Sequence, residues 1–201
     1  SEAYTEALAE RAQTLRHTHL HWTADDMDVK TPTTGLRIAT YNFERKLYAD
    51  TKHMEDALQN MQHMGINILV CTEPGQASLF NTTRITNVAR SAGYDVKYSY
   101  KDHDRDRTQP HGGIVIITDP AWSKIPCQTK MYEPPSKHLR GRMMSITFDN
   151  KTQGEHNKLQ IIAAHLLNSA HTKHTETAGL LGWACARTTE FHSKYPKAST
   201  I

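Results

Sequence analysis

The sequence predicts a mixed α/β (α+β) domain built in layers, in which strands outnumber helices. Short runs rich in β-branched residues recur from residue 36 to residue 164. Two amphipathic helical patterns lie between the earliest of these runs, and a third follows the last. The length of 201 residues fits one domain with an extension.

The first 35 residues differ from the rest and are expected to form an N-terminal helix and linker. Tyr4, Leu8, Ala12 and Leu15 recur at helical spacing within residues 1–16. Residues 17–35 are polar and lack periodicity. We therefore expect two parts, an extension over 1–35 and a partial domain over 36–201.

The elements of this domain follow from periodicity and from glycines that end helices. Residues 50–64 carry four apolar side chains on one helical face and end at Gly65. A second helix, over 83–92, ends at Gly93, and a third covers 173–193. Strands are expected at 36–41, 66–71, 94–100, 114–117, 142–148 and 159–164, and another begins at residue 200. Residues 119–141 contain four prolines and are expected to be irregular.

Composition and charge exclude several classes of protein. The net charge of +3 permits a nucleic-acid partner without requiring one. The three cysteines are far apart and form no CxxC pair, which argues against a disulfide scaffold or a cysteine-based zinc site. No apolar run is long enough to span a membrane, and the polar N-terminus is no secretory signal. We expect an intracellular, nuclear protein with no membrane partner.

Polar side chains stand where three of the predicted strands end. Asn42 ends the first strand, Glu73 follows a buried strand, and His165 and Asn168 follow the last complete strand. Sites of α/β proteins lie at such strand ends. A carboxylate there must be exposed, paired or metal-bound, because its burial alone is too costly. Together the four residues form the candidate catalytic site.

Five stretches of the chain have the order and spacing of motifs in a known family. They are I-A-T-Y-N (38–42), I-N-I-L-V-C-T-E (66–73), H-G-G-I-V-I-I (111–117), G-R-M-M-S-I-T-F (141–148) and I-I-A-A-H-L-L-N (161–168). On these the chain resembles the endonuclease/exonuclease/phosphatase superfamily, and most closely the apurinic and LINE-type retrotransposon endonuclease domains. The resemblance implies a four-layer, DNase I-like α/β sandwich, of which this chain holds the N-terminal part.

The resemblance also implies an activity, which is Mg²⁺- or Mn²⁺-dependent phosphodiester hydrolysis through endonucleolytic nicking of DNA. Glu73 would bind the metal and Asn42 would orient this ligand, while His165 and Asn168 would contact the scissile phosphate. Thr72 stands where the family usually has Gln, and His165 replaces the Tyr of apurinic and LINE enzymes. A hard cation prefers carboxylate oxygen, and His and Asn can donate to phosphate oxygens.

Basic residues in the loops are candidates for contacts with the nucleic-acid backbone. Arg105 and Arg107 lie in a charged loop, and Arg140 and Arg142 flank the glycine that precedes a strand. Arg142 is the strongest candidate, since the resembled family carries an Arg on this strand.

Two further motifs of the family, G-D-x-N and S-D-H, have no match in the 201 residues. We therefore expect a fragment of a longer protein, nearly inactive alone, which the remainder of the polypeptide or a partner chain completes. We also expect the inner face of the first sheet to be left exposed over several hundred Å², so that the isolated chain aggregates.

Alternatives remain open at this point. One is another phosphoesterase of the same fold, such as an RNA deadenylase or an enzyme of the inositol-phosphate or sphingomyelin type. Another is a truncated, non-catalytic structural or binding module. A third is a metal site formed by His165, His171 and His174.

Overall fold

The computed structural model describes residues 35–75, 78–99, 113–133, 139, 141–149, 158–166 and 174–201. The chain divides into two units, residues 1–34 and 35–201, and all described residues belong to the second. The helix expected over 1–16 and most of the expected linker lie outside the described residues.

The first sheet has the strand order β1-β2-β4-β3, in which β1 runs parallel to β2 and the other pairs are antiparallel. Its strands are β1 (Ile38–Asn42), β2 (Ile68–Thr72), β3 (Asp95–Tyr98) and β4 (Ile114–Thr118). The two central strands, β2 and β4, are almost completely buried. Their sequences, ILVCT and IVIIT, are nearly continuous apolar runs, as expected of strands covered on both faces.

The second sheet has the order β5-β6-β7-β8. Its strands are β5 (Cys127–Met131), β6 (Met143–Asp149), β7 (Lys158–Ala164) and the short β8 (Ser199–Thr200). β5, β6 and β7 are antiparallel, whereas β8 pairs parallel with the start of β7. The expected beginning of a strand near residue 200 is therefore a fourth strand of this sheet.

Local sequence signals set the ends of the helices. α2 (Thr51–Met64) begins at Asp50, whose side chain accepts a hydrogen bond from the His53 amide, and ends at Gly65 with a left-handed φ of 63°. α3 (Leu79–Ser91) begins at Ser78, which caps the Asn81 amide. α4 (His174–Lys194) is the longest of the described helices, and a 3₁₀ turn, η1 (Trp122–Lys124), precedes β5. None of the described helices is both long and apolar enough to cross a bilayer.

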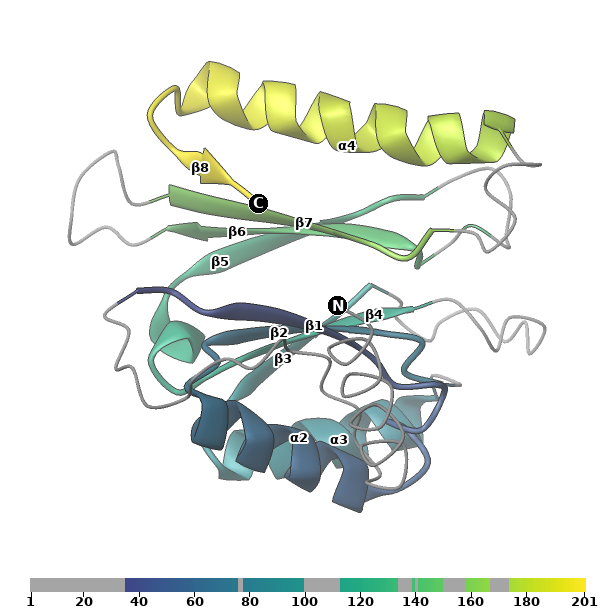
Figure 1. Cartoon of the computed structure of the whole chain (residues 1–201), viewed down its shortest axis with the longest axis vertical. Coiled ribbons are helices and arrows are strands. Elements are labelled where there is room, and N and C mark those ends of the chain that lie inside the picture. The colour runs from purple at the N-terminus through teal and green to yellow at the C-terminus, as the bar shows by residue number, and fades with distance from the viewer. Residues whose placement is uncertain are drawn as a thin grey trace, which may run out of the picture. The chain divides into compact units, whose positions relative to one another are not determined.

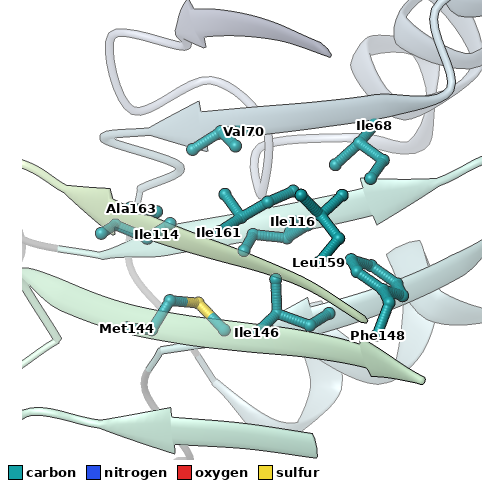
Figure 2. Close-up of a cluster of buried hydrophobic side chains, with 10 residues drawn as sticks. All are labelled: Ile68, Val70, Ile114, Ile116, Met144, Ile146, Phe148, Leu159, Ile161 and Ala163. Carbon is teal, nitrogen blue, oxygen red and sulfur yellow. The ribbon is translucent and has the colours of Figure 1, made fainter. Parts of the chain in front are cut away.

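The elements stack as four layers. α2 and α3 lie on one side of the first sheet, and α4 lies on the far side of the second (Figure 1). The core between the sheets joins side chains of β2 and β4 to side chains of β6 and β7, as Figure 2 shows. Its members are Ile68, Val70, Ile114, Ile116, Met144, Ile146, Phe148, Leu159, Ile161 and Ala163.

This core corrects one expectation from the sequence. The inner face of the first sheet is not left exposed, because β5, β6 and β7 supply a second sheet that covers it. Ile68 and Ile116 on the first sheet and Ile146 on the second are completely buried. The apolar patch that was expected to cause aggregation is therefore the inter-sheet core.

Two elements differ from the sequence prediction. α3 begins at Leu79 rather than near residue 83, because Ser78 caps it four residues earlier. β5 lies in the stretch that was expected to be irregular. Within the described residues it pairs with β6 alone, and three of its five residues are exposed, so the sequence CQTKM carries a weak apolar signal.

Candidate functional site

The candidate site begins at one edge of the first sheet, where the parallel strands β1 and β2 both end. Asn42, the last residue of β1, lies opposite Thr72, and Glu73 comes next along the chain. Asn42 is exposed, and its side-chain oxygen accepts a hydrogen bond of 2.9 Å from the Glu44 amide. The two predicted metal ligands therefore share an edge, although no contact between their side chains is found.

The backbone at Glu73 has an uncommon conformation, with φ of 48°. Left-handed residues other than glycine cost free energy and persist where the surroundings hold them. Here the β1–α2 loop does so: the Phe43 amide donates to Thr72 O at 2.9 Å, Arg45 to Glu73 O at 2.7 Å, and Tyr48 to Pro74 O at 3.0 Å. The loop thus holds the backbone that carries the carboxylate.

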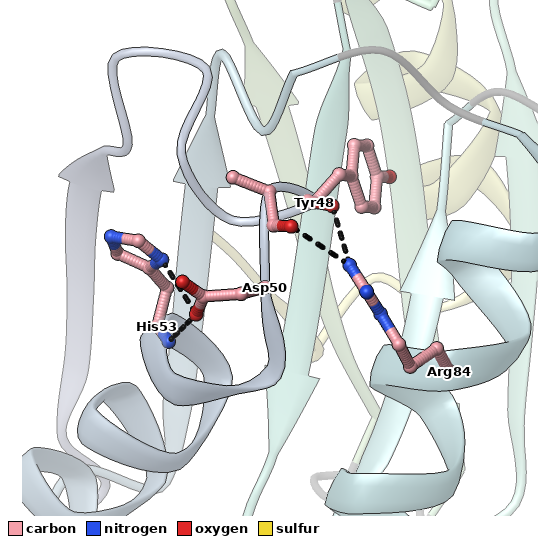
Figure 3. Close-up of polar contacts among 5 residues, drawn as sticks. Tyr48, Asp50, His53 and Arg84 are labelled. Carbon is pink, nitrogen blue, oxygen red and sulfur yellow. Dashed lines mark hydrogen bonds and ion pairs between the residues drawn. The ribbon is translucent and has the colours of Figure 1, made fainter.

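The same loop is fixed from its other side. Arg84 of α3 donates from one guanidinium nitrogen to the carbonyl oxygens of Tyr48 and Ala49, at 2.9 and 3.0 Å (Figure 3). Asp50 accepts hydrogen bonds from both the amide and the ring of His53, at 3.2 and 3.1 Å. The end of the loop that leads into α2 is therefore anchored to both α2 and α3.

His165 brings the second sheet to this edge. It follows β7, and its amide donates to Arg142 O at 2.8 Å. Its Nε2 lies 3.1 Å from Glu73 Oε1, and both side chains are largely buried, with exposed fractions of 13% and 21%. The structure thus joins two of the predicted catalytic residues across the two sheets.

Arg142 lies on the other side of the imidazole. Its Nη1 is 3.3 Å from His165 Nδ1 and 3.3 Å from His165 O. A guanidinium can only donate, so Nδ1 accepts and Nε2 carries the proton that faces Glu73. This network assigns the Nε2–H tautomer of a neutral imidazole.

The electrostatic environment of His165 also favours the neutral imidazole. Burial lowers the pKa of the His165 imidazole below its ordinary value, the Arg142 guanidinium lowers it further, and the Glu73 carboxylate opposes both. Burial also lowers the pKa of Arg142, while the Glu73 and Glu176 carboxylates raise it. Glu176, in the first turn of α4, was not singled out from the sequence, where it looks like any acidic residue of a first helical turn.

Two small residues allow close packing around the site. The buried hydroxyl of Ser99 donates to Gly141 O at 2.6 Å and accepts from the Ile114 amide at 2.8 Å, so it ties the turn before Arg142 to β4. Gly113 lies against Pro74, where an added Cβ would meet the proline ring at 3.2 Å. The glycine that the sequence singled out before β4 therefore allows close contact beside Glu73.

The donor set fits a hard divalent cation of the Mg²⁺ type. Glu73 offers a partly exposed carboxylate and Asn42 an exposed amide at the same edge. Mg²⁺ is commonly held by one or two carboxylates and keeps several waters. Among the described residues there is no group of three His, Cys, Asp or Glu side chains able to hold a metal. A zinc-type cage is thus not found in this part of the chain.

Several candidate residues fall outside the described residues. They are Asn168, the backbone-binding candidates Arg105, Arg107 and Arg140, and His171 of the alternative metal site. The side chain of His174 is likewise not described. Arg142 is the one nucleic-acid candidate whose surroundings are known, and its guanidinium is turned toward His165.

The chain is similar in structure to several solved proteins of low sequence identity. TDP2 from Caenorhabditis elegans matches with 13% identity and a TM-score of 0.51, covering 87% of this chain and 49% of that one. The human Nocturnin catalytic domain matches with 10% identity and a TM-score of 0.50, covering 82% and 61%. An endonuclease/exonuclease/phosphatase family protein from Leptotrichia buccalis matches with 14% identity and a TM-score of 0.43, covering 66% and 54%.

These likenesses establish the fold. The described layers are those of the DNase I-like, endonuclease/exonuclease/phosphatase fold, so the fold class predicted from the sequence is confirmed, and the resemblance is confirmed at the level of the fold. The chain spans about half the length of the solved structures it matches. No protein-family model matches the chain, and no curated protein matches it significantly.

Proposed function

We propose that this chain contributes the Glu73–His165 half of a divalent-metal-dependent phosphodiesterase site that nicks DNA. The observation that carries the proposal is the contact of Glu73, His165 and Arg142 where the two sheets meet. A carboxylate can hold a divalent cation, and a neutral hydrogen-bond donor and a guanidinium stabilise negative charge as it develops on a phosphate. The fold and the motif resemblance both support this reading.

Each residue has a role in the proposal. Glu73 and Asn42 would hold Mg²⁺, which when bound supplies positive charge to a phosphoryl oxygen. His165, whose Nε2 proton faces Glu73 in the structure, would turn this proton toward a phosphate oxygen once Glu73 holds the metal, and Arg142 keeps the tautomer by donating to Nδ1. Asn168 would add a second neutral donor, and Arg105, Arg107 and Arg140 would track the DNA backbone.

We further infer a setting for the activity from the resemblance to retrotransposon-type, LINE endonuclease domains. A DNA substrate supports a nuclear location. The water-activating Asp and the Asp–His pair of the resembled family would come from further polypeptide or from a partner chain. Residues 1–201 alone are then expected to bind metal and DNA but to nick slowly, because loss of a general base costs about 10²–10⁴ in rate.

Metal binding provides the first test, because it does not depend on turnover. Mn²⁺ binding to the purified chain is measured by water-proton relaxation, for the wild type, Glu73→Gln and Glu55→Gln. Glu55 is an exposed acidic residue of α2 and serves as the control for the loss of one charge. We expect Glu73→Gln to weaken binding at least about tenfold, and Glu55→Gln to have no effect. Equal affinity in all three proteins would contradict the metal assignment.

Nicking of supercoiled plasmid provides the second test, with a single-stranded RNA of equal length as the alternative substrate. We expect slow, Mg²⁺-dependent nicking of DNA, reduced about 10²–10³-fold in His165→Gln. Nicking that survives both chelation and Glu73→Gln would contradict the proposed mechanism. Cleavage of RNA alone would retain the site but replace the proposed substrate.

A further inference from the structure

The outer face of the second sheet is apolar at one end and polar at the other. Along β6 the outward side chains are Met143, Ser145, Thr147 and Asp149, and their partners on β7 include Lys158 and Gln160. α4 covers this face in Figure 1. A helix that covers a sheet usually buries apolar side chains on both surfaces. Here the C-terminal half of α4 lies over polar side chains instead.

A cavity of about 370 Å³ lies between this polar half and α4. Its floor includes Ser145 and Gln160, which are only 2% and 5% exposed. Arg187 and Phe191 of α4, together with Tyr195 just after the helix, form part of the opposite wall. The volume is at the lower end of the range for small-molecule sites.

The side chains around this cavity carry a net positive charge. Four cations line it, Lys130, Lys158, Arg187 and Lys194, against the two carboxylates of Asp149 and Glu190. Each carboxylate is paired: Asp149 with Lys158 at 2.6 Å, and Glu190 with both Lys130 at 2.8 Å and Arg187. The excess of two positive charges favours an anion.

The lining of the cavity also offers hydrogen-bond donors to a ligand. The Nε of Arg187 is buried and has no hydrogen-bond partner within the described part of the chain, although Nη1 is paired with Glu190. Lys158 and Lys194 lie over the ring of Tyr195, at 4.4 and 5.4 Å from its centre. Ser145 and Thr147 add hydroxyls from the sheet. A buried donor without a partner is costly, which an oxygen-rich ligand would offset.

We propose that this cavity, the α4–sheet pocket, binds the phosphate group of a small phosphomonoester. Such a group carries a charge of about −1.5 to −2 near pH 7 and three strong acceptor oxygens. Its charge matches the excess of two cations, and guanidinium, ammonium and hydroxyl donors suit its oxygens. The pocket lies on the outer face of the second sheet, whereas Glu73 and His165 lie where the two sheets meet, so this proposal does not rest on the proposed function.

Binding is tested on the whole chain by calorimetry at about 0.15 M salt, with adenosine monophosphate and inorganic phosphate as probes and adenosine as the uncharged control. Arg187→Gln is compared with Lys52→Gln, an exposed position of α2 that loses the same charge. We expect the monophosphate to bind, adenosine not to bind, and Arg187→Gln alone to weaken binding about tenfold. Ser145→Ala is a second variant, chosen because it removes only a hydroxyl.

Backbone amide shifts locate the bound probe. We expect changes at Ser145 and Thr147 of β6 and at Arg187 of α4, and none at Glu73. Three results would each overturn the proposal: no binding at 10 mM probe (about the weakest affinity of interest), equal weakening by Arg187→Gln and Lys52→Gln, or shifts confined to other elements. Unaltered plasmid nicking in Arg187→Gln would separate this site from the proposed phosphodiesterase site.

Discussion

At the scale of single residues, the non-glycine residues of the described chain with left-handed backbone all lie in the two loops around Glu73. Glu44, Arg45 and Glu73 all have left-handed φ values, of 47°, 71° and 48°. Each such residue costs of order 1–3 kcal/mol. Backbone hydrogen bonds between the two loops maintain this geometry, so the position of the carboxylate depends on main-chain contacts that side-chain patterns do not report.

Gly75 is the residue on which this arrangement depends most directly. A Cβ added there would lie 2.5 Å from Arg45 O, at a φ of 109°. We expect Gly75→Ala to lower the free energy of unfolding by about 2–4 kcal/mol, through both strain and the clash, and to weaken Mn²⁺ binding. Urea unfolding measures the change in stability, and the water-proton relaxation titration measures the change in Mn²⁺ binding.

Gly182 of α4 provides the control for this substitution. Nothing lies within 4 Å of an added Cβ there, and its φ is not left-handed. Gly182→Ala should raise the free energy of unfolding by about 0.5–1 kcal/mol, because alanine loses less backbone entropy in a helix. Equal effects of the two substitutions would contradict the role of Gly75.

Two buried ionisable groups, Tyr48 and Cys71, and the half-buried Tyr98 predict sensitivity to alkali. Burial raises the pKa of the Cys71 thiol above its ordinary 9.0 and the pKa of the Tyr48 hydroxyl well above 10.0. Burial also raises the pKa of Tyr98 to about 12. The unfolded chain loses these protons first, so it binds fewer protons than the folded chain above about pH 9.

The free energy of unfolding should therefore fall as pH rises from about 9 toward 12. Urea unfolding at pH 8, 9.5 and 10.5 measures the decline. Tyr98→Phe removes one of the three groups and should make the decline shallower, although loss of its hydrogen bonds to Thr82 and Thr86 lowers stability at every pH. An identical decline in the variant would show that Tyr98 does not contribute.

At the scale of elements, caps and apolar runs account for most boundaries. Asp50 and Gly65 bound α2 at the residues that the pattern predicted. β5 was missed because a strand paired on one side alone need not be rich in β-branched residues. The strand is defined by its pairing with β6 through five residues, which its own sequence does not indicate.

At the scale of the whole molecule, the inter-sheet core makes the two sheets interdependent. Each sheet presents an apolar face to the other, and those faces cover each other. Trp122 packs edge to face on Phe148, with ring centres 4.9 Å apart, which joins the connection between the sheets to the same core. Neither sheet can expose its inner face without a large loss of buried apolar area.

We therefore expect residues 35–201 to unfold as one cooperative unit. Native-state hydrogen exchange should give similar opening free energies for amides of β2, β4, β6 and β7. Ile146→Ala, at a completely buried position of β6, should lower protection in both sheets by the same amount, about 2–5 kcal/mol. A loss of protection confined to β6 and β7 would mean that the sheets unfold independently.

The candidate site was predictable in part. Strand-end polarity and motif spacing indicated Asn42, Glu73 and His165, because strand ends are visible in the apolar pattern. Nothing in the sequence indicated that Arg142 lies against His165. That contact depends on how the turn at Gly141 is tied to Ser99 on the first sheet.

The sequence by itself determined the order of the elements, most of their ends and the strand-end residues, since periodicity and caps are local properties of the chain. Only the tertiary structure decided which of these residues meet. The pairing of Glu73 with His165, the tautomer that Arg142 imposes, the covered inner face and the charged α4–sheet pocket all arise between segments far apart in the sequence. Packing of two sheets face to face fixes such contacts, because close packing of the apolar faces brings together strand ends that are distant in the sequence.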